Sequence, residues 1–146
     1  MANLVFDLET DGLLDEVTTI WCMGYSIDGS PALITRDVPR MLDIIRSADV
    51  LIGHNIIGYD LPVLNKLYGF SLPYGHSRLM DTYILSKMLY KKRQSHSLKN
   101  WGKTLGNDKG DHTDWSQYSE EMAVYCRQDV DLNLQVYNYM VGGMAQ

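Results

Sequence analysis

The chain begins with short apolar runs and continues with longer segments in which apolar residues recur at helical spacing. Runs rich in β-branched and aromatic residues are typical of strands. Such runs predict strands at Leu4–Glu9, Thr18–Ile27, Ala32–Thr35 and Val50–Ile52. The dipeptides Asp11-Gly12 and Asp28-Gly29 predict the turns that separate the first three strands.

Helical spacing predicts helices in the rest of the chain. They are Val38–Ser47, Leu61–Tyr68, Asp81–Tyr90, Leu98–Leu105 and a long helix from Ser119 to about Met140. Ser119 is a good N-cap for the long helix, and Gly142-Gly143 is predicted to end it. Its expected apolar stripe comprises Met122, Cys126, Val130, Leu134, Tyr137 and Val141. A hairpin followed by strands that alternate with helices predicts an α/β or a mixed α+β fold.

The composition is typical of one compact domain over residues 1–146, with 45% hydrophobic and 21% charged residues. No apolar run reaches the ~18–20 residues that span a bilayer. The N-terminus lacks the basic segment of a signal peptide. Cys22 and Cys126 are the only cysteines. They lack the spacing of metal ligands, and we expect them to be reduced thiols. We therefore expect a cytoplasmic protein with no membrane partner.

Two acids lie at the end of the first predicted strand. Because strand side chains alternate, Asp7 and Glu9 share one face, with Cα atoms ~6–7 Å apart. Two carboxylates at this separation can converge on one hard cation. Acids at a strand end often simply face water, so the pair by itself is weak support for a metal site.

Two more motifs supply acids. Asp60 lies beside a predicted helix start, where an acid is common for capping reasons alone. Tyr125 and Asp129 are four residues apart on the long helix and share a face, although a packed tyrosine and a solvated aspartate would give the same pattern. Taken together, the motifs supply four carboxylates and one phenol. Two-metal hydrolysis of a phosphodiester needs such a set, with the ions ~3.5–4 Å apart.

The combined motifs resemble the DEDD superfamily of 3′→5′ exonucleases. The resemblance implies a ribonuclease-H-like (DnaQ-like) α/β fold, with a mixed central sheet flanked by helices. Asp7-Leu8-Glu9 resembles the first motif, Asn55 through Asp60 the second, and Tyr125-x-x-x-Asp129 the third motif of the tyrosine-bearing DEDDy subclass. The proofreading exonuclease domain of T7-type phage DNA polymerases of family A is similar in three further segments: Asp81–Ser86, Ser95–Gly102 and Glu120–Tyr125.

The resemblance implies roles for these residues. Asp7, Glu9 and Asp129 would bind one divalent ion, Mg²⁺ or Mn²⁺. Asp7 would also contact a second ion, which Asp60 would hold directly or through water. Tyr125 would orient the attacking water. The expected reaction is hydrolysis of DNA from its 3′ end, with release of nucleoside 5′-monophosphates.

Four residues are candidates for substrate binding. Leu13 stands where related enzymes place an apolar wedge against the terminal base, and Thr10 closes the first motif. Asn55 would touch substrate or cap a loop, and His96 would contact a phosphate or shape a loop. His54 is expected to pack at a strand end. The three tryptophans could stack on bases, but core or loop anchoring is the more common role: Trp21, Trp101 and Trp115.

The net charge of −5 is unusual for a nucleic-acid-binding domain, which usually carries a basic footprint. Two Mg²⁺ ions would bring the charge to −1 and allow phosphate binding through the metal. The cluster Lys91-Lys92-Arg93 adds positive charge, although such a cluster by itself is more typical of a solvated turn.

The expected partners are single-stranded DNA or the 3′ ends of duplex DNA, together with a separate DNA polymerase. T7-type relatives carry a polymerase after this domain and are longer between the second and third motifs. Nothing follows residue 146 here, so we expect no DNA synthesis from this chain, as a stand-alone protein or an excised domain of phage or bacterial type. Two alternatives stay open: an exoribonuclease or oligoribonuclease with the same chemistry, and a non-catalytic module that binds a polymerase or DNA ends.

Overall fold

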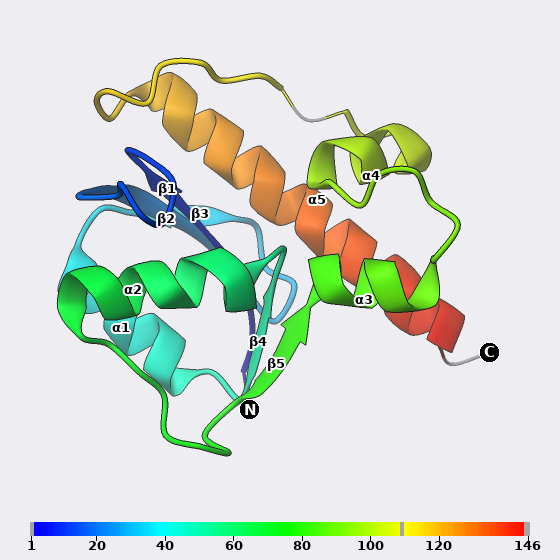
Figure 1. Cartoon of the computed structure of the whole chain (residues 1–146), viewed down its shortest axis with the longest axis horizontal. Helices are drawn as coiled ribbons and strands as arrows, with labels where there is room; N and C mark the ends of the chain where they lie inside the picture. The colour runs from blue at the N-terminus through cyan, green and yellow to red at the C-terminus, as the bar shows by residue number, and fades with distance from the viewer. Residues whose placement is uncertain (1, 109, 145–146) are drawn as a thin grey trace.

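The computed structural model describes residues 2–108 and 110–144. Its centre is a five-stranded sheet in the order β3-β2-β1-β4-β5 (Figure 1). The strands are β1 (Asn3–Thr10), β2 (Ile20–Ile27), β3 (Leu33–Thr35), β4 (Val50–Gly53) and β5 (Arg78–Asp81). β1 pairs antiparallel with β2 and parallel with β4, which confirms the predicted mixed sheet.

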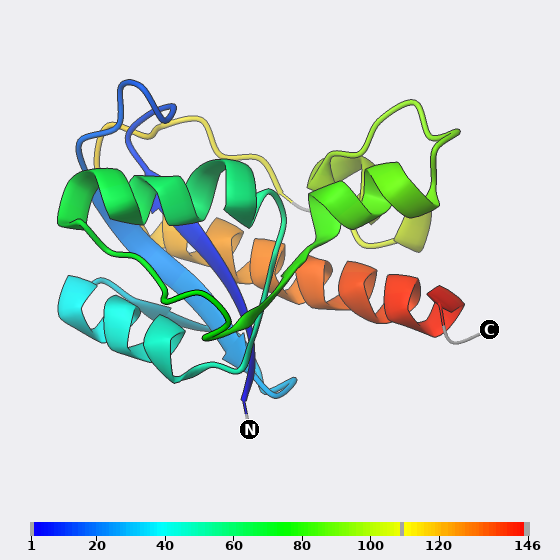
Figure 2. The same ribbon diagram turned by 60° about the horizontal axis from the view of Figure 1, so that its bottom comes forward.

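The helices form layers on both faces of this sheet. They are α1 (Val38–Ser47), a π-helical turn η1 (Ile56–Asp60), α2 (Leu61–Tyr68), α3 (Thr82–Leu89), α4 (Leu98–Leu105) and α5 (Glu120–Met144). α1 and α2 cover one face and α5 crosses the other, while α3 and α4 lie at the side, against α5 (Figures 1 and 2). Among the described residues, no helix is both long enough and apolar enough to cross a membrane.

The alternation of side chains along β1 decides which residues enter which layer. Leu4, Phe6 and Leu8 are buried in the core that includes α1 and α2. Val5 lies on the opposite face and packs with Val130 of α5. Since Asp7 and Glu9 continue the series of Val5, β1 directs both acids toward α5.

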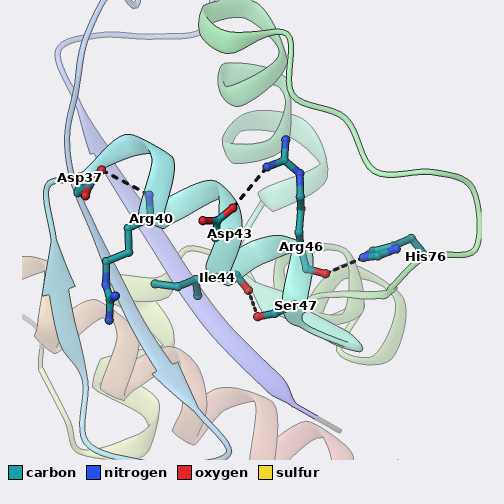
Figure 3. Close-up of polar contacts among 7 residues, drawn as sticks. All are labelled: Asp37, Arg40, Asp43, Ile44, Arg46, Ser47 and His76. Atoms are coloured by element: carbon teal, nitrogen blue, oxygen red, sulfur yellow. Dashed lines mark hydrogen bonds and ion pairs between the residues drawn. The ribbon is translucent and has the colours of Figure 1, made fainter.

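α1 has its polar groups arranged in local pairs (Figure 3). The Asp37 carboxylate accepts the backbone N–H of Arg40 at 3.4 Å and caps the helix. Arg46 pairs with Asp43 at 3.7 Å, and its carbonyl bonds His76 Nε2 at 2.7 Å. Acidic and basic side chains are therefore interleaved on this side of the molecule.

Three details differ from the prediction. β5 and η1 were not predicted, because β5 is only four residues long and η1 has no sequence periodicity of its own. The second strand begins at Ile20 and not Thr18, because Thr18 and Thr19 donate backbone N–H groups to the Asp11 carboxylate at 2.9 and 3.1 Å.

The end of α5 also differs. The helix continues through Gly142-Gly143 to Met144, so the predicted stop was wrong; neither glycine has the positive φ of a helix-ending residue. The predicted stripe is correct for Met122, Cys126 and Val130, whereas Leu134, Tyr137 and Val141 are only half-buried. In the C-terminal half, the buried apolar residues are Leu132, Val136 and Met140, because this half packs against α3 and α4 rather than on the sheet.

Candidate active site

The end of β1 places two carboxylates beneath α5. Glu9 is only 5% exposed and Asp7 is half-buried. The β1–β2 register sets Asp7 opposite Gly24 and Glu9 opposite Cys22. Acids in the central strand of a sheet are costly to bury unless a partner or a cation compensates their charge.

Gly24 allows α5 to lie close to these acids. A Cβ atom at position 24 would be 2.7 Å from Sγ of Cys126, so any other residue would push the helix away. With glycine there, the Cys126 thiol lies 3.6 Å from the Asp7 carbonyl oxygen and 3.9 Å from its Oδ2. The close approach brings the whole N-terminal half of α5, with Asp129, onto the end of β1.

Asp60 reaches the same place from the other side. It is the last residue of η1 and is only 4% exposed. Its Oδ2 accepts the backbone N–H of Leu8 at 3.1 Å, which ties it to β1 between Asp7 and Glu9. Short π-helical segments recur at functional sites, and here η1 sets the angle at which Asp60 enters.

The carboxylates repel one another. Burial, and then the charge of nearby Asp7, raise the pKa of Glu9 to about 12, with a further contribution from Asp129. Burial also raises the pKa of Asp60 well above its usual range, again with Asp7 as the main charged neighbour. Four carboxyls from β1, η1 and α5 are thus held in electrostatic contact. A bound cation would offset both the repulsion and the burial.

The ligand atoms are close enough to share an ion. One atom each from Asp7, Glu9 and Cys126 lie within 4.8 Å of one another. The pKa of Cys126 is raised by its contact with the Cys22 thiol and by burial, so this sulfur stays protonated and is a poor ligand. The oxygen ligands that remain are those that Mg²⁺ and Mn²⁺ prefer.

Tyr125 lies one helical turn before Asp129 and is half-buried. Its ring centroid is 5.8 Å from that of Trp115 and 5.9 Å from that of His112. Both neighbours come from the loop before α5, and Trp21 Nε1 fixes that loop by donating to the Trp115 carbonyl at 2.9 Å.

A cavity of about 320 Å³ opens beside Glu9. Leu13, which is 71% exposed, and Trp115 contribute apolar walls, and Tyr59 contributes to the lining. Thr10 also lines the cavity, but its hydroxyl is engaged within the protein by Tyr59 and by the Gly12 carbonyl at 3.1 Å. The cavity can therefore accept a flat group through Leu13 and Trp115, while Thr10 and Tyr59 brace the loop.

Asn55 is half-buried and has a left-handed backbone, with φ of 67°. Its N–H donates to Asp81 Oδ1 at 2.9 Å, and that of Ile57 donates to Asp81 Oδ2 at 3.0 Å. Asp81 also accepts the N–H groups of Tyr83 and Ile84 at the start of α3. Asp81 thus caps α3 and in addition holds the segment that leads into η1.

His96 lies farther from the acids, in the loop between α3 and α4. Its Nδ1 bonds the Ser86 hydroxyl at 2.5 Å, and its carbonyl bonds His54 Nε2 at 2.7 Å. His54 also contacts the Thr82 hydroxyl at 2.8 Å. The two histidines join the α3–α4 segment to the end of β4, which agrees with the packing role expected for His54.

Sequence reasoning gave too little weight to several residues at this site. The sequence assigned no role of their own to Tyr59 and His112, and it predicted only a core position for Cys126. Trp115 was assigned to loop anchoring, but it also lines the cavity beside Glu9. The sequence signal that could have pointed to Trp115 was an aromatic residue seven to ten positions before Tyr125. Such a signal is not specific. Trp101 is 1% exposed, which confirms its expected core position.

The fold and this cluster of acids agree with a family-level match. The chain belongs to the RNase H superfamily, whose profile matches residues 4–141. The resemblance expected from the motifs is also confirmed at the sequence level. The chain is 27% identical to the DNA-directed DNA polymerases of Escherichia phage T7 and Enterobacteria phage T3, over 176 aligned positions. The matches cover 87% of this chain and only 25% of each polymerase.

Solved structures confirm the fold. Brucella melitensis NrnC superimposes with a TM-score of 0.75 at 22% identity, covering 96% of this chain and 72% of NrnC. NrnC with bound Mg²⁺ gives 0.72 with the same identity and coverage. NrnC bound to pGG gives 0.73 at 21% identity, covering 94% of this chain and 71% of NrnC.

Proposed function

We propose that this chain is a divalent-metal-dependent exonuclease that hydrolyses DNA from its 3′ end and releases nucleoside 5′-monophosphates. The observation that carries the proposal is the group of carboxyls from β1, η1 and α5, in which burial and then mutual repulsion raise the pKa of Glu9 to about 12. Carboxyls whose pKa values are raised by burial and by one another cluster at functional sites, and a bound cation would offset their repulsion.

In the proposed site, Asp7, Glu9 and Asp129 hold one ion, and Asp7 and Asp60 hold a second. When bound, these ions supply the positive charge that lowers the pKa of a water molecule and stabilises the departing 3′ oxygen. The donor set fits Mg²⁺ or Mn²⁺, because the chain offers carboxylate oxygens and a protonated thiol.

The remaining residues position the substrate. The phenol of Tyr125, on the same helix as Asp129, orients the attacking water. Leu13 packs against the terminal base in the cavity beside Glu9, which Trp115 also lines. Thr10 contributes mainly by bracing this loop, and Asn55 by shaping the segment before η1. His96 belongs to the α3–α4 segment, where the strand would leave the site.

DNA is the preferred substrate in this proposal, because the sequence relatives are DNA polymerases. Proofreading or trimming of DNA ends beside a polymerase is the corresponding setting, with single-stranded DNA or duplex 3′ ends as the partner. Since the chain spans a quarter of the length of those polymerases, this setting is part of the proposal. The NrnC structure bound to pGG favours a second candidate, the hydrolysis of short oligoribonucleotides.

Digestion of a 5′-labelled single strand tests the proposal. We expect Mg²⁺ or Mn²⁺ to produce a ladder that shortens from the 3′ end of DNA, and EDTA to prevent it. Degradation of RNA but not DNA would favour the second candidate. If neither strand is cleaved faster by the wild type than by Asp7→Ala, the chain is a non-catalytic binding module and the proposed reaction is wrong.

A further inference from the structure

The segment that comprises α3, α4 and the loop between them, residues 82–107, has an unusual charge. It contains six basic residues and no Asp or Glu: Lys87, Lys91, Lys92, Arg93, Lys99 and Lys103. Because the whole chain has a net charge of −5, the other 120 residues carry −11. We call residues 82–107 the basic lobe. The short cluster noticed in the sequence is one part of it.

The basic lobe is firmly attached to the rest of the fold. Trp101 is buried against Leu132 and Val136 of α5. Trp101 Nε1 donates to the Ser86 hydroxyl at 2.9 Å, and Asn133 Nδ2 donates to the Thr82 hydroxyl at 2.9 Å. Figure 2 shows the lobe standing beside the sheet, over the C-terminal half of α5.

One of the six cations organises the lobe, and most of the others face solvent. Arg93 stacks on Trp101 at 3.7 Å and donates to Asn100 Oδ1 at 2.5 Å, which fixes the loop between the helices. The lysines at positions 91, 92 and 103 are exposed. Their positive charge is therefore presented to solvent from a fixed backbone, a suitable arrangement for binding successive phosphates.

The lobe adjoins the candidate active site. Lys99 Nζ lies 2.9 Å from Asp111 Oδ1, in an exposed pair that contributes little to stability. Asp111 lines the same surface depression as Tyr125 and Gln128, and two further acids, Glu120 and Glu121, line it as well. Gln128 Oε1 in turn accepts the backbone N–H of Gly110 at 3.2 Å. A strand that leaves the acidic cluster on the Tyr125 side would next meet α4.

We propose that the basic lobe binds the sugar–phosphate backbone of a single nucleic-acid strand, on the 5′ side of the phosphate at the acidic cluster. The direction of the strand rests on the proposed exonuclease function, whereas binding to the lobe does not. The proposal explains how an acidic protein holds a polyanion: the metal site takes the 3′-terminal phosphodiester and the lobe takes those that precede it.

The test is equilibrium binding of a 5′-fluorescein-labelled dT12 strand, measured by anisotropy in EDTA so that no hydrolysis occurs. The variant Lys91→Gln/Lys92→Gln/Lys103→Gln should bind about tenfold more weakly at low salt. The slope of log K against log salt should become shallower by about 2, because each contact with a single strand contributes ~0.7.

The matched control removes three cations on other parts of the surface: Arg40→Gln/Arg46→Gln/Arg78→Gln. Arg40 and Arg46 lie on α1 among acids (Figure 3), and Arg78 begins β5, at the opposite end of the strands from Glu9. We expect this variant to bind within twofold of the wild type. Equal losses in the two triple variants, no loss in the lobe variant, or no binding of dT12 by the wild type would overturn the proposal.

Cleavage in Mg²⁺ separates the two proposals. If the lobe acts as proposed, its variant should raise KM for dT12 several-fold and leave KM for a two-nucleotide strand unchanged, because the short strand does not reach the lobe. Salt-dependent binding through the lobe without any cleavage would contradict the exonuclease proposal alone. Normal cleavage with unchanged binding in the lobe variant would contradict the lobe alone.

Discussion

The two halves of α5 lie against regions of opposite charge. The N-terminal half lies on the acids of β1, which form a cluster with Asp60 of η1, and the pKa values of Glu9 and Asp60 are raised by burial and by neighbouring carboxyls. The C-terminal half supports the basic lobe, whose lysines are exposed and have no acid within residues 82–107. Like charges in solvent cost little because water and salt screen them, whereas like charges in a low-dielectric interior are expensive.

The contrast indicates that the acidic cluster, and not the basic lobe, lowers the stability of the fold in the absence of a ligand. Exposed lysines of the lobe can be replaced with little effect on folding. Replacing a buried acid of the cluster should change stability and activity in opposite directions. The predictions below use this difference, from the largest expected effect to the smallest.

Asp7→Asn should have the largest effect, because Asp7 contacts both proposed ions and is the main charged neighbour of Glu9 and Asp60. We expect the rate of 3′ shortening of a labelled strand to fall by about 10³-fold or more, which corresponds to ~4 kcal/mol of transition-state stabilisation. Asp15→Asn, an exposed acid between β1 and β2, is the control. A loss of less than tenfold in Asp7→Asn would remove Asp7 from the site.

Asp81 joins the two regions, since its carboxylate accepts N–H groups from the segment before η1 and from the start of α3. Asp81→Ala leaves these partly buried donors unsatisfied and should lower the free energy of unfolding by ~2–4 kcal/mol, measured by urea denaturation. The control Asp37→Ala removes a single cap on α1 and should cost ~1 kcal/mol (Figure 3). Equal losses would show that Asp81 acts only as a cap.

Glu9→Gln should stabilise the metal-free protein while slowing cleavage. Folding raises the Glu9 pKa from 4.5 to about 12, so the folded state binds this proton more tightly than the unfolded state. The Glu9 side chain makes its full contribution to folding stability below pH 4.5, where its carboxyl is protonated. This contribution is lost as the pH rises toward 12 and the buried carboxyl ionises. At pH 7 the glutamine should add ~1–3 kcal/mol.

The measurement is urea denaturation in EDTA at pH 5 and pH 8, with the exposed Glu16→Gln as control. The gain in Glu9→Gln should be larger at pH 8. A gain that is independent of pH would mean that the Glu9 carboxyl is not the source of the repulsion.

Tyr125→Phe should have the smallest effect of the set. Removing the phenol hydroxyl should slow cleavage about tenfold, as loss of one water-orienting group, and should leave the melting temperature unchanged. Tyr139→Phe, on the same helix but beside the basic lobe, is the matched control. Identical rates for the two variants would contradict the water-orienting role.

Much of this arrangement could be predicted from local sequence. Periodicity identified β1, α1 and α5, and the spacing of Asp7, Glu9, Tyr125 and Asp129 identified the motif residues. The spacing could not show that Gly24 lets α5 approach Cys126, because that contact depends on residues far apart in the chain.

Long-range contacts also determine the other features that the sequence did not predict. β5 is short and is defined by its pairing with β4, and Trp115 lies in a loop whose path depends on Trp21. The basic lobe was visible in the sequence only as Lys91-Lys92-Arg93. The full extent of the lobe depends on the packing of α3 and α4 as one unit on α5.

The central claim is that the acids at the end of β1 form a cation site, and magnesium-dependent thermal unfolding tests it most directly. Melting temperatures would be compared in 10 mM MgCl₂ and in NaCl of equal ionic strength, for the wild type and for Asp7→Asn. For a site with a dissociation constant near 1 mM, we predict a gain of ~1.4 kcal/mol, or a few degrees, in the wild type and little in the variant. An unchanged melting temperature in the wild type, or an equal rise in Asp7→Asn, would contradict the account.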